Sequence, residues 1–340
     1  MSVPLIEIMR ATVGLSIQDM GRTGTTAIGL SQGGAMDKLA LIEATALLGK
    51  THPSPAIEFM GVGGSLRVLC DMTVALTGAE MHVKVGDRVL QWNATHTLNA
   101  GEIMELSAPK SGVYGYVTPH AELATPRVFD SRSSHVSAGV GHWLQIGDVI
   151  NGTSAPAVRS KKIRAVDRLG GGTVRYLAGP QTDLFSDADL DRFHATPFRA
   201  SHIANRRGVK VDFEGAPFTP QNAHGIVSDI NVTGDIQMTG DGEPYVLMSE
   251  CQTMGGYPRI GTVIPADLPV LAQAKAGAPI RFEQITLEQA DTIMADPISA
   301  GTLSPRLSTL VREPAEISDL LSYQLISGAI TGYEDLEPLK

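Results

Sequence analysis

Short apolar runs that follow a glycine turn are the feature that most constrains the fold of this chain. Gly stands beside an acidic or small residue directly before each run. The pattern recurs in four segments: 85–90, 100–106, 146–150 and 276–282. Glycine adopts positive φ without steric cost, so each segment is typical of a turn that leads into a strand. Because 36 Gly and 20 Pro residues are spread along 340 positions, the sequence predicts many short strands.

Alternating apolar and polar residues mark four strands, at 74–77, 83–85, 114–117 and 174–177. Helical spacing is rarer. Asp37 is placed to cap a helix over 38–48, which Gly49 would end. Further helices are expected over three segments: 183–193, 287–295 and 315–325. We therefore predict a mainly β fold with a few short helices.

The segment 151–170 indicates a domain boundary. It contains Pro, Gly, Ser and several basic residues but little periodicity, and strand-like sequence resumes at Gly172. We expect an N-terminal β unit over 1–160, a C-terminal β unit over 170–296 and a helical C-terminal extension over 297–340. The extension either packs across the two β units or forms an oligomer interface.

Charge and composition exclude several classes of protein. Asp and Glu outnumber Lys and Arg by 36 to 27, which argues against a nucleic-acid-binding surface. No apolar run reaches the roughly 18 to 20 residues of a membrane span, and the first residues do not resemble a secretory signal. The two cysteines, Cys70 and Cys251, lie far apart, as is usual in a reducing compartment. We expect a soluble, cytoplasmic protein without a membrane partner.

A glycine-rich loop brings Gln18, Asp19 and Arg22 together in the first half of the chain. Such a loop lets backbone N–H groups and an arginine approach an anion or a carboxylate. The alternative is a turn in which Asp19 pairs with Arg22 and nothing binds. A Gly-Gly turn at 33–34 precedes the helix that Asp37 caps, and capping alone explains Asp37 fully.

Three further polar segments are candidates for binding. Ser131, Arg132 and Ser133 suit a carboxylate or phosphate oxygen, although self-satisfied serines in a turn explain them equally well. Arg206 and Arg207 follow Asn205, and neighbours in a strand point to opposite faces, so one arginine should face solvent. The segment 250–261 holds Gly255 and Gly256 in a tightly specified loop. That loop presents Gln252 and Tyr257, which are able to recognise a ureido or amide group.

Other chemistry has little support in the sequence. The nine histidines show no metal-binding spacing, so no metal site is expected. Cys251 would need a nearby base to act as a nucleophile. No G-x-S-x-G nucleophile motif and no phosphate-binding loop occurs.

These loops together resemble the allophanate hydrolase subunit 2 family, whose members are also described as biotin-dependent carboxyltransferase-like proteins and as the C subunit of 5-oxoprolinase. The matching motifs run in order along about residues 12–290. They are 18–22, 34–37, 57–59, 75–79, 131–133 and 252–261, of which the last is the most specific.

The resemblance implies two cyclophilin-like β-barrel units and a partner of the allophanate hydrolase subunit 1 type. The first function it implies is part of an ATP-dependent 5-oxoprolinase, which opens a lactam to glutamate with a further, lactam-hydrolase subunit. The second is carboxyl transfer from carboxybiotin to urea or a related amide. The third is a regulatory binding protein that antagonises an inhibitor of a kinase. ATP or carboxybiotin would be held by a partner, and no cofactor is bound covalently because the chain lacks a biotinylation motif.

Set beside the residue chemistry, the resemblance implies two sets of site residues. The expected catalytic residues are Asp19, Arg22, Asp37 and Tyr257. The expected substrate-binding residues are Gln18, Ser131, Arg132, Ser133, Asn205, Arg206, Gln252, Gly255 and Gly256.

Overall fold

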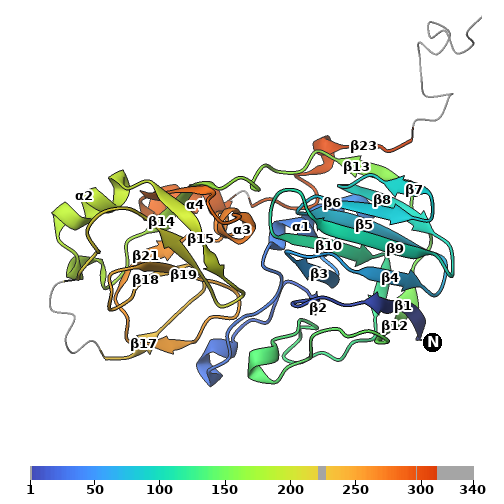
Figure 1. The fold of residues 1–340 in the computed structure, drawn as a ribbon, viewed down its shortest axis with the longest axis horizontal. Coiled ribbons are helices and arrows are strands. Elements are labelled where there is room, and N and C mark those ends of the chain that lie inside the picture. Colours follow the sequence, from blue (N-terminus) through green and yellow to red (C-terminus); the bar gives the residue numbers. More distant parts are fainter. Residues whose placement is uncertain (1, 221–226, 296, 312–340) are drawn as a thin grey trace, which may run out of the picture.

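A computed structural model describes residues 2–220, 227–295 and 297–311 of this chain, and most of this part is β-structure. Two β units lie side by side, with the N-terminal unit on the right and the C-terminal unit on the left of Figure 1. The mainly β fold predicted from the glycine turns is confirmed. The glycines of those turns, Gly86, Gly101, Gly147 and Gly277, all adopt positive φ.

The N-terminal unit consists of two seven-stranded sheets around one core. The first sheet has the order β11 (Ala121–Leu123), β12 (Val149–Ser154), β1 (Val3–Arg10), β4 (Ser65–Val68), β9 (Ile103–Pro109), β6 (Met81–Val85) and β7 (Arg88–Leu90). The second has the order β2 (Ser16–Gln18), β3 (Ala56–Met60), β10 (Tyr114–Pro119), β5 (Met72–Gly78), β8 (Ala94–Leu98), β13 (Lys161–Ile163) and β23 (Leu307–Thr309). The strands at the four sheet ends have three residues each, and the pairings leave two sheets rather than one closed barrel.

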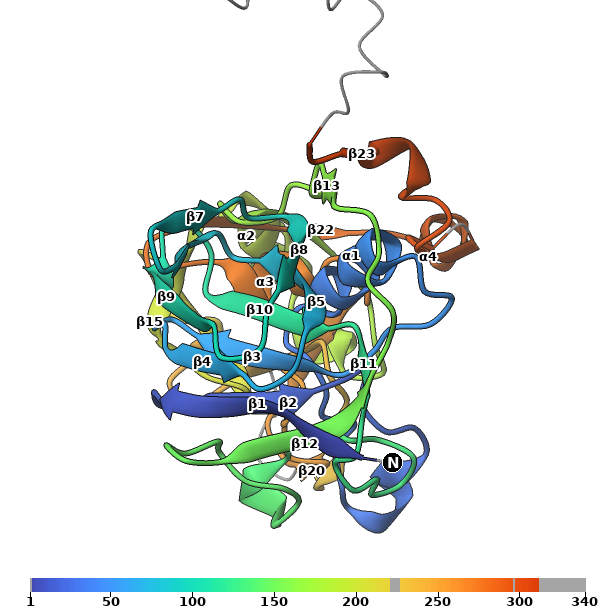
Figure 2. The ribbon, with the colours of Figure 1, turned by 90° about the vertical axis from the view of Figure 1, so that its right-hand side faces the viewer.

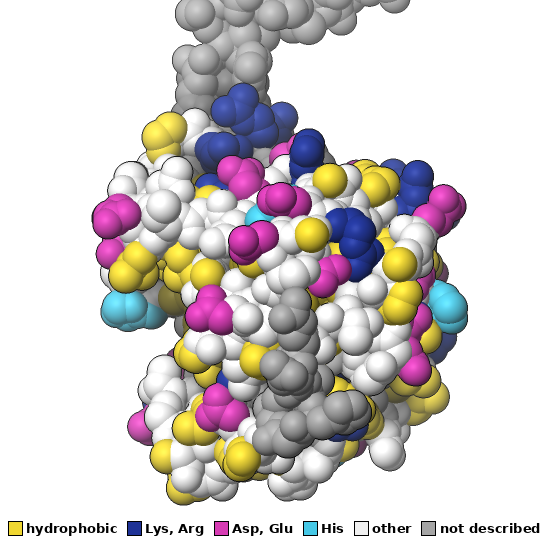
Figure 3. All heavy atoms as spheres, turned by 90° about the vertical axis from the view of Figure 1, so that its left-hand side faces the viewer, with side chains coloured by type: hydrophobic (Ala, Val, Ile, Leu, Met, Phe, Trp, Pro, Cys, Tyr) yellow, Lys and Arg dark blue, Asp and Glu magenta, His cyan; other side chains and the backbone are white. Residues whose placement is uncertain are grey.

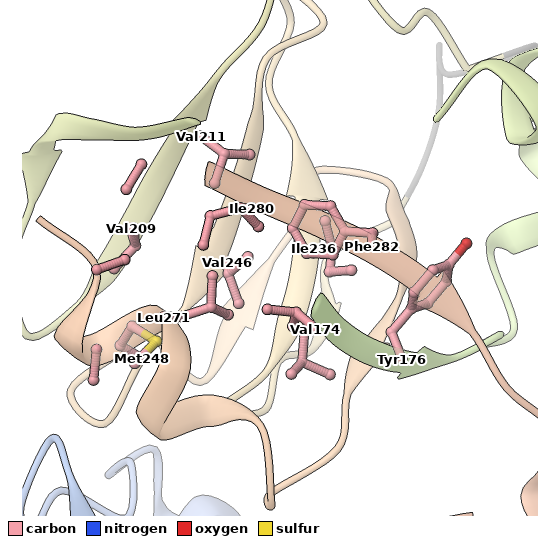
Figure 4. Close-up of a cluster of buried hydrophobic side chains, with 14 of the residues drawn as sticks. Val174, Tyr176, Val209, Val211, Ile236, Val246, Met248, Leu271, Ile280 and Phe282 are labelled. Carbon is pink, nitrogen blue, oxygen red and sulfur yellow. The ribbon is translucent and has the colours of Figure 1, made fainter. Parts of the chain in front are cut away.

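The C-terminal unit is a closed barrel. Its order is β14 (Gly172–Leu177), β21 (Arg259–Val263), β18 (Asp235–Met238), β19 (Pro244–Leu247), β16 (Gly208–Asp212), β15 (Phe198–Ala204) and β22 (Pro279–Gln284). A parallel pairing of β14 with β22 closes it. Below the barrel, β17 (Asp229–Ile230) pairs with β20 (Met254–Gly255). Apolar side chains such as Val174, Ile236 and Phe282 point from these strands into the barrel (Figure 4).

Four α-helices occur among the described residues: α1 (Lys38–Leu48), α2 (Asp187–Ala195), α3 (Leu268–Gln273) and α4 (Leu287–Ala295). Four 3-10 turns accompany them: η1 (Thr25–Ile28), η2 (Val136–Ala138), η3 (Thr182–Leu184) and η4 (Ser304–Arg306). Helix α1 has the predicted bounds, because Asp37 Oδ1 accepts from Ala40 N at 3.1 Å and Gly49 ends the helix at φ 65°. The helix expected over 183–193 begins later, at Asp187, because Ser186 caps it.

The buried cluster of the barrel extends across the interface into the N-terminal unit, while the interior of the two N-terminal sheets forms a separate cluster. Helix α1 packs against β5, and its neighbours Ala35 and Met36 belong to the same buried cluster as the barrel residues Val209 and Met248. Figure 1 shows α1 at the side of the N-terminal unit that faces the C-terminal unit, and Figure 2 shows it beside β5. Burial on both sides explains why nine of the eleven residues of α1 are buried. The two units are therefore packed against each other through side chains and not only connected by the chain.

Two strands near the expected domain boundaries pair across those boundaries. Strands β13 and β23 both belong to the second N-terminal sheet, although they follow position 160 and position 296 respectively. The expected helix over 315–325 and the rest of the extension beyond 311 lie outside the described residues. The division into 1–160, 170–296 and 297–340 stays a prediction.

The surface of the C-terminal unit carries both charges. Acidic and basic side chains are interspersed over the face seen in Figure 3. Within the described ranges, no helix combines the length and the apolar character needed to cross a membrane.

Phe193 is expected to be the most sensitive apolar position of the barrel. Its ring is fully buried, and its centroid lies 5.0 Å from those of Phe198 and Phe282. Phe193→Ala should lower the free energy of unfolding by about 3–5 kcal/mol, because it leaves a cavity in a packed core. Urea denaturation measures this change. Val89→Ala, at an exposed position, is the control, and an equal loss in both variants would contradict the assignment.

Candidate functional site

Arg206 connects the two units at their interface, which we call the seam. It lies in the turn between β15 and β16, is 3% exposed and reaches into the N-terminal unit. Its Nη2 donates to the carbonyl of Gly34 at 2.7 Å, its Nε pairs with Glu250 Oε1 at 2.6 Å, and its Nη1 pairs with Glu58. Arg207 is exposed, so the expectation that one of the two arginines faces solvent is confirmed.

Glu58 connects Arg206 to the residues at the start of α1 through hydrogen bonds. Its Oε2 accepts from Met36 N at 2.9 Å and from the Tyr116 hydroxyl at 2.8 Å, and that hydroxyl accepts from Asp37 N at 2.8 Å. Burial raises the pKa of Tyr116 well above its ordinary value, and the neighbouring Glu58 adds to this. Tyr116 is therefore a neutral donor at physiological pH.

Asp37 is engaged through both of its carboxylate oxygens. Oδ1 caps α1, while Oδ2 accepts from Arg168 Nε and from Gln273 Nε2, both at 2.7 Å. Arg168 also pairs with Glu43 Oε2 at 2.8 Å. The geometry supports the capping interpretation of Asp37, and its catalytic role stays a prediction.

Asp19 joins two of the predicted loops. Its Oδ1 accepts from Ser131 Oγ at 2.7 Å, and its Oδ2 accepts from Arg132 N at 2.6 Å. Ser131 Oγ lies 2.6 Å from Ser133 Oγ. Gln18 Nε2 donates to the carbonyl of Ser134 at 3.1 Å. Asp19 therefore holds the second loop in place, and it makes no ion pair with Arg22 in the part of the chain that the structure describes.

Six of the thirteen predicted site residues line cavities, and they are divided among three separate ones. Asp19 and Arg132 line the outer cavity, of about 590 Å³, together with Lys50, His52 and Glu122. Arg132 is held there by Glu122 Oε1, 2.8 Å from its Nη2.

A second cavity, of about 290 Å³, lies between the units, and we call it the seam cavity. Its lining residues are Arg22, Thr23, Gly24, Thr26, Ser31, Gln32, Asn231, Val232, Thr233, Cys251 and Thr253. In Figure 1 the blue loop that contains η1 extends from the N-terminal unit toward the C-terminal one. Arg22 is 1% exposed and donates through Nη2 to the carbonyl of Ser133 at 2.5 Å. Its Nε and Nη1 are buried without a hydrogen-bond partner.

The third cavity, the loop cavity of about 270 Å³, brings together three predicted residues. Its lining residues are Ile203, Asn205, Arg207, Gly208, Gln237, Thr239, Tyr245, Leu247, Gln252 and Tyr257. Tyr257 is 48% exposed at the edge, and Asn205 Oδ1 accepts from Arg207 N at 2.7 Å. The amides of Asn205 and Gln252 and the phenol of Tyr257 supply both donors and acceptors to a small polar ligand.

The predicted glycines have different surroundings. A Cβ on Gly255 would lie 2.5 Å from Asn231 Nδ2 and 3.2 Å from Gln252 Nε2, so a side chain there would displace the amide of Asn231. Gly256 is exposed. Gly255 thus keeps the wall between the seam cavity and the loop cavity thin.

Several residues of this site were not among those predicted from the sequence. Arg168 lies in the segment interpreted as a domain boundary, and Asn231 belongs to no motif. Glu58 could have been noticed, because a carboxylate between Ile57 and Phe59 in a buried strand needs a partner.

Comparison with known proteins agrees with the two-unit fold. Residues 28–284 match the family described as carboxyltransferase domain, subdomain A and B. The chain is 31% identical over 290 residues to the C subunit of the Haemophilus influenzae 5-oxoprolinase and 32% identical over 291 residues to that of Escherichia coli. Each alignment covers 84% of this chain and 93% of the relative.

The urea amidolyase of Kluyveromyces lactis has a similar structure, with a TM-score of 0.75 and 23% sequence identity. The similarity covers 86% of this chain but 19% of the amidolyase chain, so this chain spans about a fifth of that protein. It shows that the two proteins share a fold.

Arg206→Met should destabilise the protein by about 3–5 kcal/mol, because it leaves Glu58 and Glu250 as buried carboxylates without their cation. Burial raises the pKa of Glu58, and Arg206 opposes this, so the variant's Glu58 should have a still higher pKa. A carboxyl group with a raised folded-state pKa loses its contribution to stability as pH rises through that pKa. The deficit should therefore be small near pH 4 and grow toward pH 8.

Chemical denaturation at several pH values measures this deficit. Arg207→Met is the matched control, and its effect should stay within about 0.5 kcal/mol. A deficit in Arg206→Met that shrinks as pH rises would contradict the assignment.

Cys251 should be unreactive in the folded protein. It is buried in the wall of the seam cavity, and burial raises the pKa of its thiol to about 11. Iodoacetamide at pH 8 should alkylate Cys70, which is partly exposed, faster than Cys251, and unfolding in urea should abolish the difference. Peptide mass spectrometry measures both rates. Equal labelling of the folded protein would show that the thiol is accessible.

Proposed function

The chain belongs to the family described as carboxyltransferase domain, subdomain A and B, and we propose that it is the C subunit of a 5-oxoprolinase. In the proposed reaction one water adds across the lactam C–N bond of 5-oxoproline and gives glutamate, while a second water hydrolyses ATP to ADP and phosphate. The observation that carries this proposal is the alignment with two proteins named as the C subunit of 5-oxoprolinase over 93% of their length.

The loop cavity is the part of this chain that we assign to the lactam. A lactam presents one N–H donor and one carbonyl acceptor side by side. The amides of Gln252 and Asn205 can pair with both, and the exposed Tyr257 hydroxyl can donate to the carbonyl as charge develops on its oxygen. Asp19 faces the outer cavity instead.

We assign ATP to a partner, because this sequence has no phosphate-binding loop. The proposed partners are a protein of the allophanate hydrolase subunit 1 type and a lactam-hydrolase subunit, in the cytoplasm. Relatives that are named as one subunit of a 5-oxoprolinase imply other subunits, which supports a heteromeric enzyme.

Carboxyl transfer is the second candidate, and the family's description as a carboxyltransferase domain favours it. A partner's carboxybiotin would supply an activated carboxyl group for a urea or amide nitrogen. The amides of the loop cavity suit a ureido ring as well as a lactam, so this cavity does not separate the two reactions. A regulatory binding role without chemistry is the third candidate.

The test is glutamate release from 5-oxoproline by this chain co-expressed with its two proposed partners, with and without ATP. Release that requires ATP is expected. Tyr257→Phe should lower kcat about 10²-fold, since it removes one donor to the lactam carbonyl. Tyr176→Phe makes the same change elsewhere in the barrel, where the hydroxyl contacts His194 Nε2 at 2.7 Å, and should keep full activity.

Two results would contradict the proposal. If an intact complex released no glutamate, carboxyl transfer and regulatory binding would remain. Biotin-dependent consumption of urea would then support carboxyl transfer, and its absence would support regulatory binding. Full activity of Tyr257→Phe in an active complex would remove this tyrosine from the reaction.

A further inference from the structure

We propose that the seam cavity is a binding site for a small carboxylate, held by Arg22 of the N-terminal unit and Asn231 of the C-terminal unit. As an assignment of substrate class the inference rests on the proposed function, because 5-oxoproline carries a carboxylate beside its lactam and urea carries none. The site itself is argued from the contacts of these two side chains.

Arg22 is a buried cation with unused donors. Its Nη2 donates to Ser133, but Nε and Nη1 have no acceptor, and the side chain makes no ion pair within the described ranges. Asp19 is held by Ser131 and Arg132, and Glu250 pairs with Arg206. Asp19 and Glu250 lie close enough to favour the charge of Arg22, but both are engaged with these other groups, so an anion brought to Nε and Nη1 would supply the acceptors that these atoms lack.

Asn231 provides an unused donor from the other unit. The residue is 1% exposed, and its Oδ1 accepts from Gln237 Nε2 at 3.0 Å. Its Nδ2 has no hydrogen-bond partner. Both residues line the seam cavity, but their unused nitrogens are buried, so a ligand would reach them through small side-chain movements. Such donors favour a ligand that carries acceptors, and the guanidinium favours an anion.

The backbone around Arg22 keeps space for this guanidinium. Arg22 N donates to the carbonyl of Gln32 and Gly33 N to that of Ser249, both at 2.9 Å, which fixes the loop against the C-terminal unit. Gly33 has φ 62°, and a Cβ there would lie 2.6 Å from Arg22 Nη1. A side chain at position 33 would therefore displace the guanidinium.

The position of the seam cavity beside the loop cavity identifies the class of carboxylate. Asn231 lines the first cavity, Gln237 lines the second, and their side chains are hydrogen-bonded to each other. Gly255 adds no side chain between them. A ligand with a carboxylate next to an amide would place one group on each side of this pair. A planar two-oxygen anion matches the single guanidinium, whereas a phosphate would leave charge unpaired.

Isothermal titration of the full chain with three probes tests the inference. 5-Oxoproline carries lactam and carboxylate, 2-pyrrolidinone carries the lactam alone, and cyclopentanecarboxylate carries the carboxylate alone. Asn231→Asp keeps the acceptor for Gln237 but replaces the unused donor with an anionic oxygen in the cavity. It should weaken both carboxylates at least 10-fold and leave 2-pyrrolidinone unchanged. Asn151→Asp, on the exposed side of β12, adds the same charge and should change nothing.

Arg22→Lys is the second variant, which keeps the charge but loses the planar fork, and it should give an intermediate loss. The inference is overturned if the wild-type chain does not bind carboxylates, or if Asn231→Asp binds them as tightly as the wild type. If only the proposed function is wrong, the result differs. Carboxylates would still bind in an Arg22-dependent way, but the assembled complex would release no glutamate. Should Asn231→Asp fail to fold, Arg22→Lys decides by itself.

Discussion

The ion pairs of Arg206 at the seam are the interaction on which the rest of the site depends. Its guanidinium is buried between Glu58 and Glu250, and it also holds the carbonyl of Gly34. Charges at this depth are tolerated only when their geometry is satisfied, so the two units have to meet in one relative position. Through Tyr116 the same contact fixes the first turn of α1.

This fixed seam explains why the cavities differ in character. The outer cavity lies within the N-terminal unit, and the loop cavity lies on the barrel. The seam cavity exists only because a loop near Arg22 meets a loop near Asn231. Residues of both units line the seam cavity, so their relative positions are kept only if the backbone is rigid on both sides. The contacts of Arg206 and Gly33 supply that rigidity.

The proteins similar to this chain include some that are named for a lactam substrate and others that are named for urea. A scaffold shared by both reactions cannot itself choose the substrate, because function depends on the groups in the site. The amides around Gln252 suit either substrate. In our proposal Arg22 distinguishes them, because a guanidinium whose Nε and Nη1 lack acceptors favours a substrate with a carboxylate.

Patterns among neighbouring residues were enough to predict the glycine turns, a minority of the strands, α1 with its cap at Asp37, and the loops that carry the motifs. Helix α3 was missed, since six residues give little periodicity. The packing of distant segments showed which arginine is buried, that Asp19 holds Ser131 rather than Arg22, and that Asn231 lines the seam cavity. Arg206 and Glu58 are 148 positions apart, and a local pattern carries no information about such a pair. Burial and partner choice arise when distant segments pack together, so the sequence indicated candidate residues but not the contacts that each of them makes.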